Sequence, residues 1–224
     1  AFELPDDQLN KAVNDNPEFE MQIADHEGVN HIFSVKIITL DSSLSYIAVF
    51  HDITQFKNTE KKLTKEAETD SLTGLMNRHR LNKELEMALS LVQNQKKRIS
   101  FIIIDIDNFK RINDTYGHIV GDYALVTLSK ICKDKMRATD IVARWGGEEF
   151  MIVLYNTDTE QAFKIIDALR ETIAKSPFDH FDHLTCSFGL TQMREEDSIE
   201  TLTKRADGAL YHAKETGKNK VVIA

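Results

Sequence analysis

The sequence predicts an α+β fold, with a central sheet that contains antiparallel strands and is flanked by helices. A small antiparallel β segment and a linker helix precede this fold. Three observations support the prediction. Apolar residues recur at helical spacing in four segments after residue 77, and short apolar runs rich in β-branched residues alternate with these segments. Two of the runs flank a Gly146-Gly147 pair, which is the pattern of a two-residue β-hairpin turn.

The N-terminal part, residues 1–53, is expected to form a small β segment. Its three extended stretches, residues 18–25, 31–40 and 44–54, are separated by polar turns, as in an antiparallel meander. Residues 54–69 are charged and helix-prone and predict a linker helix. Phe56 and Leu63 are seven residues apart, which fits one seam of a short parallel coiled coil. A solvated linker helix explains the composition nearly as well, and both interpretations stay open.

The third expected domain covers residues 70–224. From residue 77 the predicted order is helix, strand, helix, helix, strand, strand, helix, strand, helix, strand. The apolar stripes of the helices are interpreted as core positions. They consist of Leu81, Leu85, Ala88, Leu89 and Val92; Ala124, Leu125, Leu128, Ile131 and Cys132; Ala162, Ile165, Ile166, Leu169 and Ile173; and Leu202, Ala206, Ala209, Leu210 and Ala213.

Carboxylates follow the predicted buried strand at residues 99–104. Asp105 lies where this strand meets the surface, and strand alternation puts Asp105 and Asp107 on one face. We interpret Asp107 as the N-cap of a helix over residues 108–116 rather than as a metal ligand.

The hairpin brings two more carboxylates, Glu148 and Glu149, next to two glycines. Glutamates are poor strand formers, so local structure alone does not explain them. Mg²⁺ takes hard oxygen ligands and typically one or two protein carboxylates. Asp105, Glu148 and Glu149 meet that requirement, and a second ion would fit a nucleotidyl-transfer site.

Composition excludes several other classes of protein. The formal net charge of -8 and the lack of a basic stripe argue against a nucleic-acid binder. Cys132 and Cys186 lie in apolar contexts and predict buried free thiols in a reducing compartment. No apolar run reaches the length of a membrane span. We expect a cytoplasmic chain, whose full-length protein could be tethered to a membrane upstream.

The hairpin segment RWGGEEF, residues 144–150, resembles the hallmark of the GGDEF family in its GGEEF variant. Four further blocks match in the family's order and bring the resemblance to roughly the last 155 residues. These are DSLTGLMNR at 70–78, IDIDNFKRINDTYGHIVGD at 104–122, TCSFGL at 185–190 and ADGALYHAKETGKNKV at 206–221. The resemblance implies a palm-like nucleotide-cyclase fold and a diguanylate cyclase, which condenses two GTP molecules into cyclic di-GMP and two pyrophosphates.

The end of the N-terminal part, residues 48–63, resembles the exit from a PAS domain, where the last strand runs through a DIT segment into a helix. A complete PAS domain is larger than 53 residues, so this would be its C-terminal portion only. A short β appendage unrelated to sensing is the alternative.

The resemblance also implies roles for individual residues. Asp105, the Ile106 backbone carbonyl, Glu148 and Glu149 would hold Mg²⁺, two ions per active site, with Mn²⁺ as an alternative ion. Glu148 or Glu149 would accept the proton of the attacking 3′-hydroxyl. Gly146 and Gly147 would let the turn lie against the nucleotide, where a Cβ would intrude.

Further positions match the family's nucleotide contacts. Asn113 and Asp122 match the positions that read guanine, and a carboxylate can accept both guanine donors at once. Helix capping is the alternative role for Asp122. Lys110 and Lys214 match phosphate contacts. Lys218 stands where the family more often has arginine, so the charge is kept but the bidentate fork is lost.

The RxxD segment of Arg137 and Asp140 matches the family's inhibitory site, where cyclic di-GMP binds away from catalysis. An ordinary surface pair is the alternative. One GTP per domain implies a homodimer. The main hypothesis is therefore a signal-regulated diguanylate cyclase. The alternatives are a non-catalytic receptor for GTP or cyclic di-GMP, a cyclase that accepts ATP, which Asp122 disfavours, and a template-dependent polymerase, which would need a basic groove.

Overall fold

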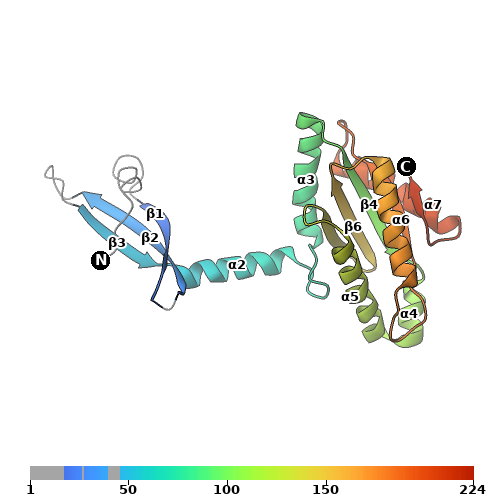
Figure 1. Cartoon of the computed structure of the whole chain (residues 1–224), viewed down its shortest axis with the longest axis horizontal. Coiled ribbons are helices and arrows are strands. Elements are labelled where there is room, and N and C mark those ends of the chain that lie inside the picture. Colours follow the sequence, from blue (N-terminus) through green and yellow to red (C-terminus); the bar gives the residue numbers. More distant parts are fainter. Residues whose placement is uncertain (1–17, 27, 40–45) are drawn as a thin grey trace. The chain divides into compact units, whose positions relative to one another are not determined.

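The computed structural model describes residues 18–26, 28–39 and 46–224, without the side chains of residues 39, 46, 61–63, 65 and 66. The chain divides into two compact units, Ala1–Lys65 and Glu66–Ala224 (Figure 1).

The first unit contains the predicted antiparallel meander. Strands β1 (Glu18–Ala24), β2 (Asn30–Thr39) and β3 (Tyr46–Asp52) form an antiparallel sheet in the order β1-β2-β3. The middle strand buries Val35 and Ile37. The three-stranded sheet confirms the predicted β segment, whereas its relation to a PAS domain stays a prediction.

Helix α2 (Thr54–Glu68) follows the sheet directly. The carboxylate of Asp52 accepts a hydrogen bond from the backbone N–H of Thr54 at 2.9 Å, which stabilises the start of the helix. Phe56 is 67% exposed. The side chain of Leu63 lies outside the described residues, so the coiled-coil seam stays a prediction.

The second unit is built on a five-stranded sheet in the order β5-β6-β4-β7-β8. The first three strand pairs are antiparallel, and β8 runs parallel to β7. Every residue of the central strand β4 is buried, as expected for its apolar sequence. The strands are β4 (Ile99–Ile106), β5 (Ile141–Gly146), β6 (Glu149–Tyr155), β7 (Cys186–Gln192) and β8 (Val221–Ile223).

Helices cover both faces of this sheet. One apolar cluster joins the sheet to α4, α5 and α6, and a second joins it to α3 and α7. The element order and the two-sided packing confirm the predicted α+β fold (Figure 1). The helices are α3 (Arg78–Gln95), α4 (Phe109–Tyr116), α5 (His118–Lys135), α6 (Thr159–Lys175) and α7 (Ile199–Glu215).

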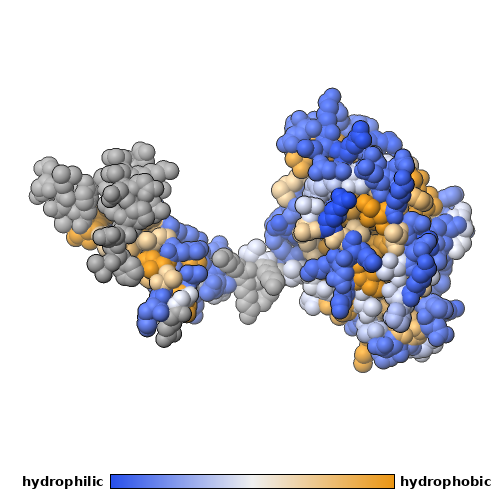
Figure 2. Space-filling view, viewed as in Figure 1, coloured by the Kyte–Doolittle hydropathy of each residue, from blue (hydrophilic) through white to orange (hydrophobic). Residues whose placement is uncertain are grey.

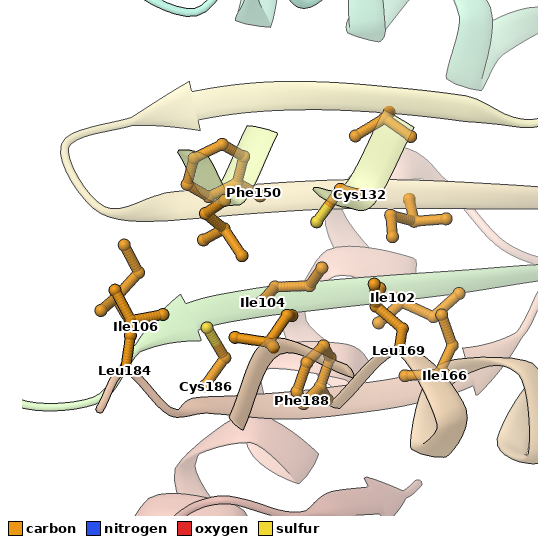
Figure 3. Packing of buried hydrophobic residues seen from close by; sticks show 14 of the residues in the cluster. Ile102, Ile104, Ile106, Cys132, Phe150, Ile166, Leu169, Leu184, Cys186 and Phe188 are labelled. Carbon is orange, nitrogen blue, oxygen red and sulfur yellow. The ribbon is translucent and has the colours of Figure 1, made fainter. Parts of the chain in front are cut away.

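Strand alternation divides the residues of β4 between the two clusters. Ile102, Ile104 and Ile106 pack with Phe150 and Phe188 toward α5 and α6 (Figure 3). Ile99, Phe101 and Ile103 face α3 and α7. The predicted stripes of α3 and α7 are buried throughout, whereas Ile131 of α5 and Ile165 of α6 are only partly buried.

Both cysteines are free and buried, as predicted. Burial raises the pKa of Cys132 to about 12, so this thiol stays protonated and unreactive. Cys132 and Cys186 both belong to the cluster shown in Figure 3.

Polar and charged residues occupy most of the visible surface of the second unit, interrupted by smaller apolar patches (Figure 2). Within residues 18–26, 28–39 and 46–224, no helix is both long enough and apolar enough to cross a membrane.

Candidate active site

The candidate site begins at Asp105, near the end of β4. Asp105 takes the next place in the row of Ile99, Phe101 and Ile103, and it is only 6% exposed. The ammonium group of Lys214, on α7, lies 2.8 Å from its Oδ2. A strand that is otherwise apolar therefore ends in a buried carboxylate with one cationic neighbour.

The β5–β6 hairpin presents the two glutamates beside Asp105. Gly146 pairs with Glu149, so the two turn residues are Gly147 and Glu148. The turn thus lies one residue later than the predicted Gly-Gly turn. Gly147 adopts φ 51°, which glycine reaches without strain. Glu149 pairs directly with Asp105 across β4 and β6, and directly opposed residues project to the same face of a sheet.

All three carboxyl groups have raised pKa values. Burial is the main cause for Asp105, and Lys214 only partly offsets it. Burial and the charge of Asp105 raise the pKa values of both Glu148 and Glu149. The site therefore concentrates negative charge that Lys214 alone does not neutralise.

This charge fits a hard divalent cation. Mg²⁺ needs only one or two protein carboxylates and completes its shell with substrate oxygens and water. No group of three or more His, Cys, Asp or Glu side chains is already arranged around a cation position in the described part of the chain. Asp105 instead shares its Oδ2 with Lys214, which would have to yield to an ion.

An arginine side chain forms hydrogen bonds to the hairpin turn. Arg144 donates from Nε and Nη2 to the Gly147 carbonyl at 3.1 and 2.8 Å, and its Nη1 lies 3.1 Å from Oδ1 of Asp70. Burial alone would raise the pKa of Asp70, but hydrogen bonds from Thr73 and Arg144 outweigh it and lower that pKa. The segment after α2 is thus tied to the turn that carries Glu148, a link that the sequence analysis missed.

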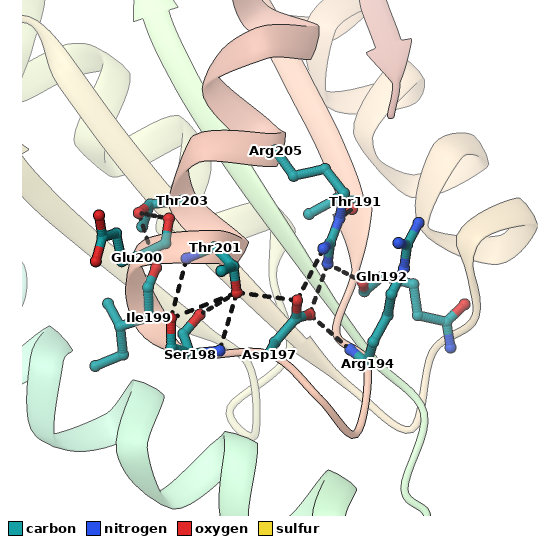
Figure 4. Close-up of polar contacts among 10 residues, drawn as sticks. All are labelled: Thr191, Gln192, Arg194, Asp197, Ser198, Ile199, Glu200, Thr201, Thr203 and Arg205. Carbon is teal, nitrogen blue, oxygen red and sulfur yellow. Dashed lines mark hydrogen bonds and ion pairs between the residues drawn. The ribbon is translucent and has the colours of Figure 1, made fainter.

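A second polar network fixes the start of α7, the helix that carries Lys214. Arg205 donates to both oxygens of Asp197 at 2.8 and 2.6 Å, and to Thr191 Oγ1 at 2.7 Å on β7 (Figure 4). Ser198 and Thr201 form a capping box at the same end. These contacts anchor α7 on β7.

Asp107 does not cap α4, contrary to the prediction. The residue before α4 is Asn108, whose left-handed backbone (φ 58°) makes no side-chain cap. The Asp107 carboxylate instead accepts hydrogen bonds from Thr185, Ser187 and the backbone N–H of Asn219. The prediction was wrong because these partners are remote in the sequence.

Asn113 and Asp122 come from neighbouring helices. A Cβ added to Gly121 would lie 2.0 Å from Asn113 Oδ1, so the Asn113 side chain rests against the residue that precedes Asp122. Helix α5 begins at His118, so Asp122 lies inside this helix and does not cap it. Asn113 thus lies beside the turn of α5 that carries Asp122, and Asp122 is exposed.

The three lysines that are predicted to contact phosphates lie in different surroundings. Lys110 is exposed in the first turn of α4. Lys218 follows α7, and its ammonium group donates to Asn108 Oδ1 at 2.5 Å. The charge of Lys218 also acts on Asp105, lowering the pKa of that carboxyl group in opposition to burial. Lys214 and Lys218 thus lie near the end of β4.

Arg137 and Asp140 meet in the turn after α5. The backbone N–H of Arg137 donates to Asp140 Oδ2 at 3.1 Å, and that of Asp140 donates to the Arg137 carbonyl at 3.0 Å. Asp140 Oδ1 is buried without a hydrogen-bond partner among the described residues. Arg137, which carries the guanidinium group, is exposed.

Comparison with known proteins identifies most of the second unit as a member of the family that the sequence resembles. Residues 67–220 match the family model described as "Diguanylate cyclase, GGDEF domain". The chain is 37% identical over 182 residues to the diguanylate cyclase DgcM of Escherichia coli, covering 80% of the chain. It spans 43% of that relative's length.

Two solved structures are similar in fold. The coiled coil and GGDEF domain of DgcB from Caulobacter crescentus, in complex with c-di-GMP, align with a TM-score of 0.72 and 26% identity, covering 77% of this chain and 93% of that one. The active GGEEF domain of a diguanylate cyclase from Vibrio cholerae aligns with a TM-score of 0.63 and 37% identity, covering 66% of this chain and 97% of that one.

Proposed function

The chain belongs to the family of diguanylate cyclase GGDEF domains, and we propose that it condenses two GTP molecules into cyclic di-GMP and two pyrophosphates. One observation carries the proposal. Glu149 pairs directly with Asp105 across two strands, and Glu148 occupies the adjoining glycine turn, where the charge of Asp105 raises the pKa values of both glutamates. Carboxylates placed in this way favour a divalent cation.

Asp105, the Ile106 carbonyl, Glu148 and Glu149 would hold Mg²⁺, with two ions per active site. Bound ions of this kind neutralise phosphate charge and lower the pKa of an attacking hydroxyl. Glu149 is fixed opposite Asp105 on the sheet, whereas Glu148 stands in the turn. We therefore assign Glu148 as the proton acceptor for the 3′-hydroxyl and Glu149 chiefly as a metal ligand.

The remaining assignments follow the chemistry of GTP. Asn113 and Asp122 would read the guanine N1–H and N2–H₂ donors, and adenine would leave the Asp122 carboxylate unpaired. Lys110, Lys214 and Lys218 would contact the phosphates. The bare backbone at Gly146 and Gly147 would let the turn lie against the nucleotide. Gly147 also has a left-handed backbone (φ 51°), in which a residue with a side chain would be strained.

The reaction joins two nucleotides, and the chain offers one set of these residues. We therefore infer that two protomers face each other, each with one bound GTP. Residues 1–53 and the helix over residues 54–69 would then act as a PAS-derived segment and a signalling helix that regulate this pairing.

Arg137 and Asp140 form the proposed product-inhibition site. Arginine can bind phosphate through its fork or stack on guanine, and the unpartnered Asp140 Oδ1 could be satisfied by a donor from a ligand. We expect Arg137→Ala to weaken inhibition by cyclic di-GMP while the initial rate stays unchanged. Unchanged inhibition in a steady-state assay with added product would exclude this site.

The activity is tested by incubating the chain with GTP and Mg²⁺ and identifying the products by mass spectrometry. We expect cyclic di-GMP and pyrophosphate, both lost in Glu149→Ala. Glu195→Ala, at an exposed glutamate, is the matched control and should keep full activity. GTP that binds without conversion, even at high protein concentration, would favour the alternative of a non-catalytic receptor.

A further inference from the structure

Asp107 is a buried carboxylate that the proposed reaction does not use. It is 6% exposed and accepts three hydrogen bonds, from Thr185 Oγ1 at 2.7 Å, Ser187 Oγ at 2.6 Å and the Asn219 backbone N–H at 3.0 Å. Its own backbone N–H donates to the Thr185 carbonyl at 2.9 Å. A buried carboxylate satisfied by several donors is held firmly in one position.

One of these donors belongs to the segment that carries Lys218. Lys218 and Asn219, between α7 and β8, both adopt left-handed backbones, with φ 60° and 43°. Two successive non-glycine residues in this region need outside contacts to stay there. At one end of the segment, the Lys218 backbone N–H donates to the Ala213 carbonyl. At the other end, the Lys220 carbonyl accepts from the backbone N–H of Phe188.

At the middle of the segment, the Asp107 carboxylate accepts the hydrogen bond from the Asn219 backbone N–H. From there, the Lys218 side chain reaches Asn108, the neighbour of Asp107 in the chain. Asp107 thus links three parts of the structure. It directly follows β4, its carboxylate accepts from Thr185 before β7 and Ser187 within β7, and it accepts from Asn219 in the loop that carries Lys218.

We propose that Asp107 is a positioning residue for triphosphate recognition, which holds the Lys218 loop at the distance where its ammonium group can meet the phosphates. This inference rests on the proposed function, because that proposal assigns Lys218 to the triphosphate. Lys218 offers a single ammonium group to the phosphates. A single ammonium group depends more on its placement than a fork that can donate from several nitrogens.

A merely structural role for Asp107 would weaken folding and all nucleotide binding together. A positioning role would weaken the binding of phosphates selectively and leave the base contacts intact, because Asn113 and Asp122 lie on α4 and α5. The ratio of triphosphate to monophosphate affinity therefore separates the two roles.

The test is equilibrium binding of 3′-deoxy-GTP and 3′-deoxy-GMP, which lack the attacking hydroxyl and are not converted, to the full chain with Mg²⁺. Asp107→Asn removes an acceptor position from the three-donor cluster. The expected result is a loss of about tenfold in 3′-deoxy-GTP affinity, the size of one charge-assisted hydrogen bond. Affinity for 3′-deoxy-GMP should change less than about twofold.

A double-mutant cycle checks that the effect passes through Lys218. In a Lys218→Met background, Asp107→Asn should no longer change the triphosphate-to-monophosphate ratio, since coupled residues show non-additive effects. An equal loss for both nucleotides, or a ratio that falls by the same factor in the Lys218→Met background, would overturn the proposal.

If Asp107→Asn does not fold, the pair Thr185→Val and Ser187→Ala replaces it. This pair keeps the carboxylate but removes two of its three donors, and the same selective loss is expected. Wild-type chain that binds the two nucleotides equally would instead refute the phosphate role of the lysines and so the proposed function. A wild-type preference for the triphosphate that every variant retains would refute only the inference about Asp107.

Discussion

Among single residues, Glu149 shows the conflict between function and stability most directly. Burial and the charge of Asp105 raise its pKa. A carboxyl group with a raised pKa stabilises the fold only while it is protonated, and that contribution is lost as the pH rises through the folded-state value. Without metal, the ionised form of Glu149 therefore opposes folding.

We predict that Glu149→Gln raises the melting temperature of the metal-free chain at pH 7 and abolishes turnover. The gain in melting temperature should shrink as the pH is lowered below the ordinary glutamate pKa of about 4.3, where the wild-type side chain becomes protonated in both states. Thermal melts across this pH range, with Glu195→Gln as control, measure it. A Glu149→Gln chain that melts lower than wild type at pH 7 would show that the repulsion is not significant.

Gly121 is a second residue that matters for the site, because it has no side chain. An added Cβ would lie 2.0 Å from Asn113 Oδ1, the movable end of a side chain, so Asn113 would have to turn away. We predict that Gly121→Ala lowers GTP affinity about tenfold through the lost base contact. Stability should change little, because alanine favours the helix by about 1 kcal/mol over glycine and offsets the local strain.

Nucleotide titrations and thermal melts test this prediction. Gly208→Ala is the matched control, since Gly208 is also helical and a Cβ there meets nothing within 4 Å. Equal GTP affinity in the Gly121→Ala and Gly208→Ala chains would mean that Asn113 does not contact the base.

At the scale of elements, the position of Lys214 depends on how closely α7 packs on β7. A Cβ at Gly189 would lie 2.1 Å from the Ala206 carbonyl oxygen and 2.6 Å from the Leu210 nitrogen, which are backbone atoms of α7. Backbone atoms cannot turn aside as a side chain can, so the whole helix would have to move.

We predict that Gly189→Ala destabilises the chain by at least about 1–3 kcal/mol, the usual cost of overpacking. Urea unfolding measures the loss, again with Gly208→Ala as control. The displaced α7 should also pull Lys214 from Asp105 and reduce turnover at temperatures where the variant stays folded. An unfolding midpoint equal to that of wild type would contradict the close helix–strand contact.

Elements were predictable where the pattern is local. The helical stripes such as Leu81, Leu85 and Ala88 follow from spacing alone, and Asp105 follows from its place at the end of an apolar run. The bonds that organise the site are not local. Asp70 and Arg144 are 74 residues apart, and Asp107 and Ser187 are 80 apart. No periodicity indicates such pairs, which explains why Asp107 was misread as a helix cap.

The hairpin register shows the same limit on a smaller scale. The glycine pair located the turn to within one residue, but the register of the hairpin, with its bulge between Arg144 and Gly146, puts Glu148 in the turn in place of Gly146. The Arg144 side chain donates to the Gly147 carbonyl within the hairpin and also reaches Asp70, 74 residues away. A contact as remote in the sequence as that with Asp70 cannot be predicted from the local Gly-Gly pattern.

At the scale of the whole molecule, the proposed chemistry requires more than one chain. Each chain supplies one set of base-reading, phosphate-binding and carboxylate residues, whereas the product contains two guanosine units. If two protomers must meet, the specific activity depends on the fraction of paired chains.

The most direct test measures the initial rate of cyclic di-GMP formation, with the product identified by mass, over a range of protein concentrations at which light scattering gives the dimer fraction. We predict that the rate per chain rises with the dimer fraction and that Glu149→Ala forms no product at any concentration. Cyclic di-GMP formed at full rate by monomers, or a dimer that binds GTP without converting it, would contradict the account.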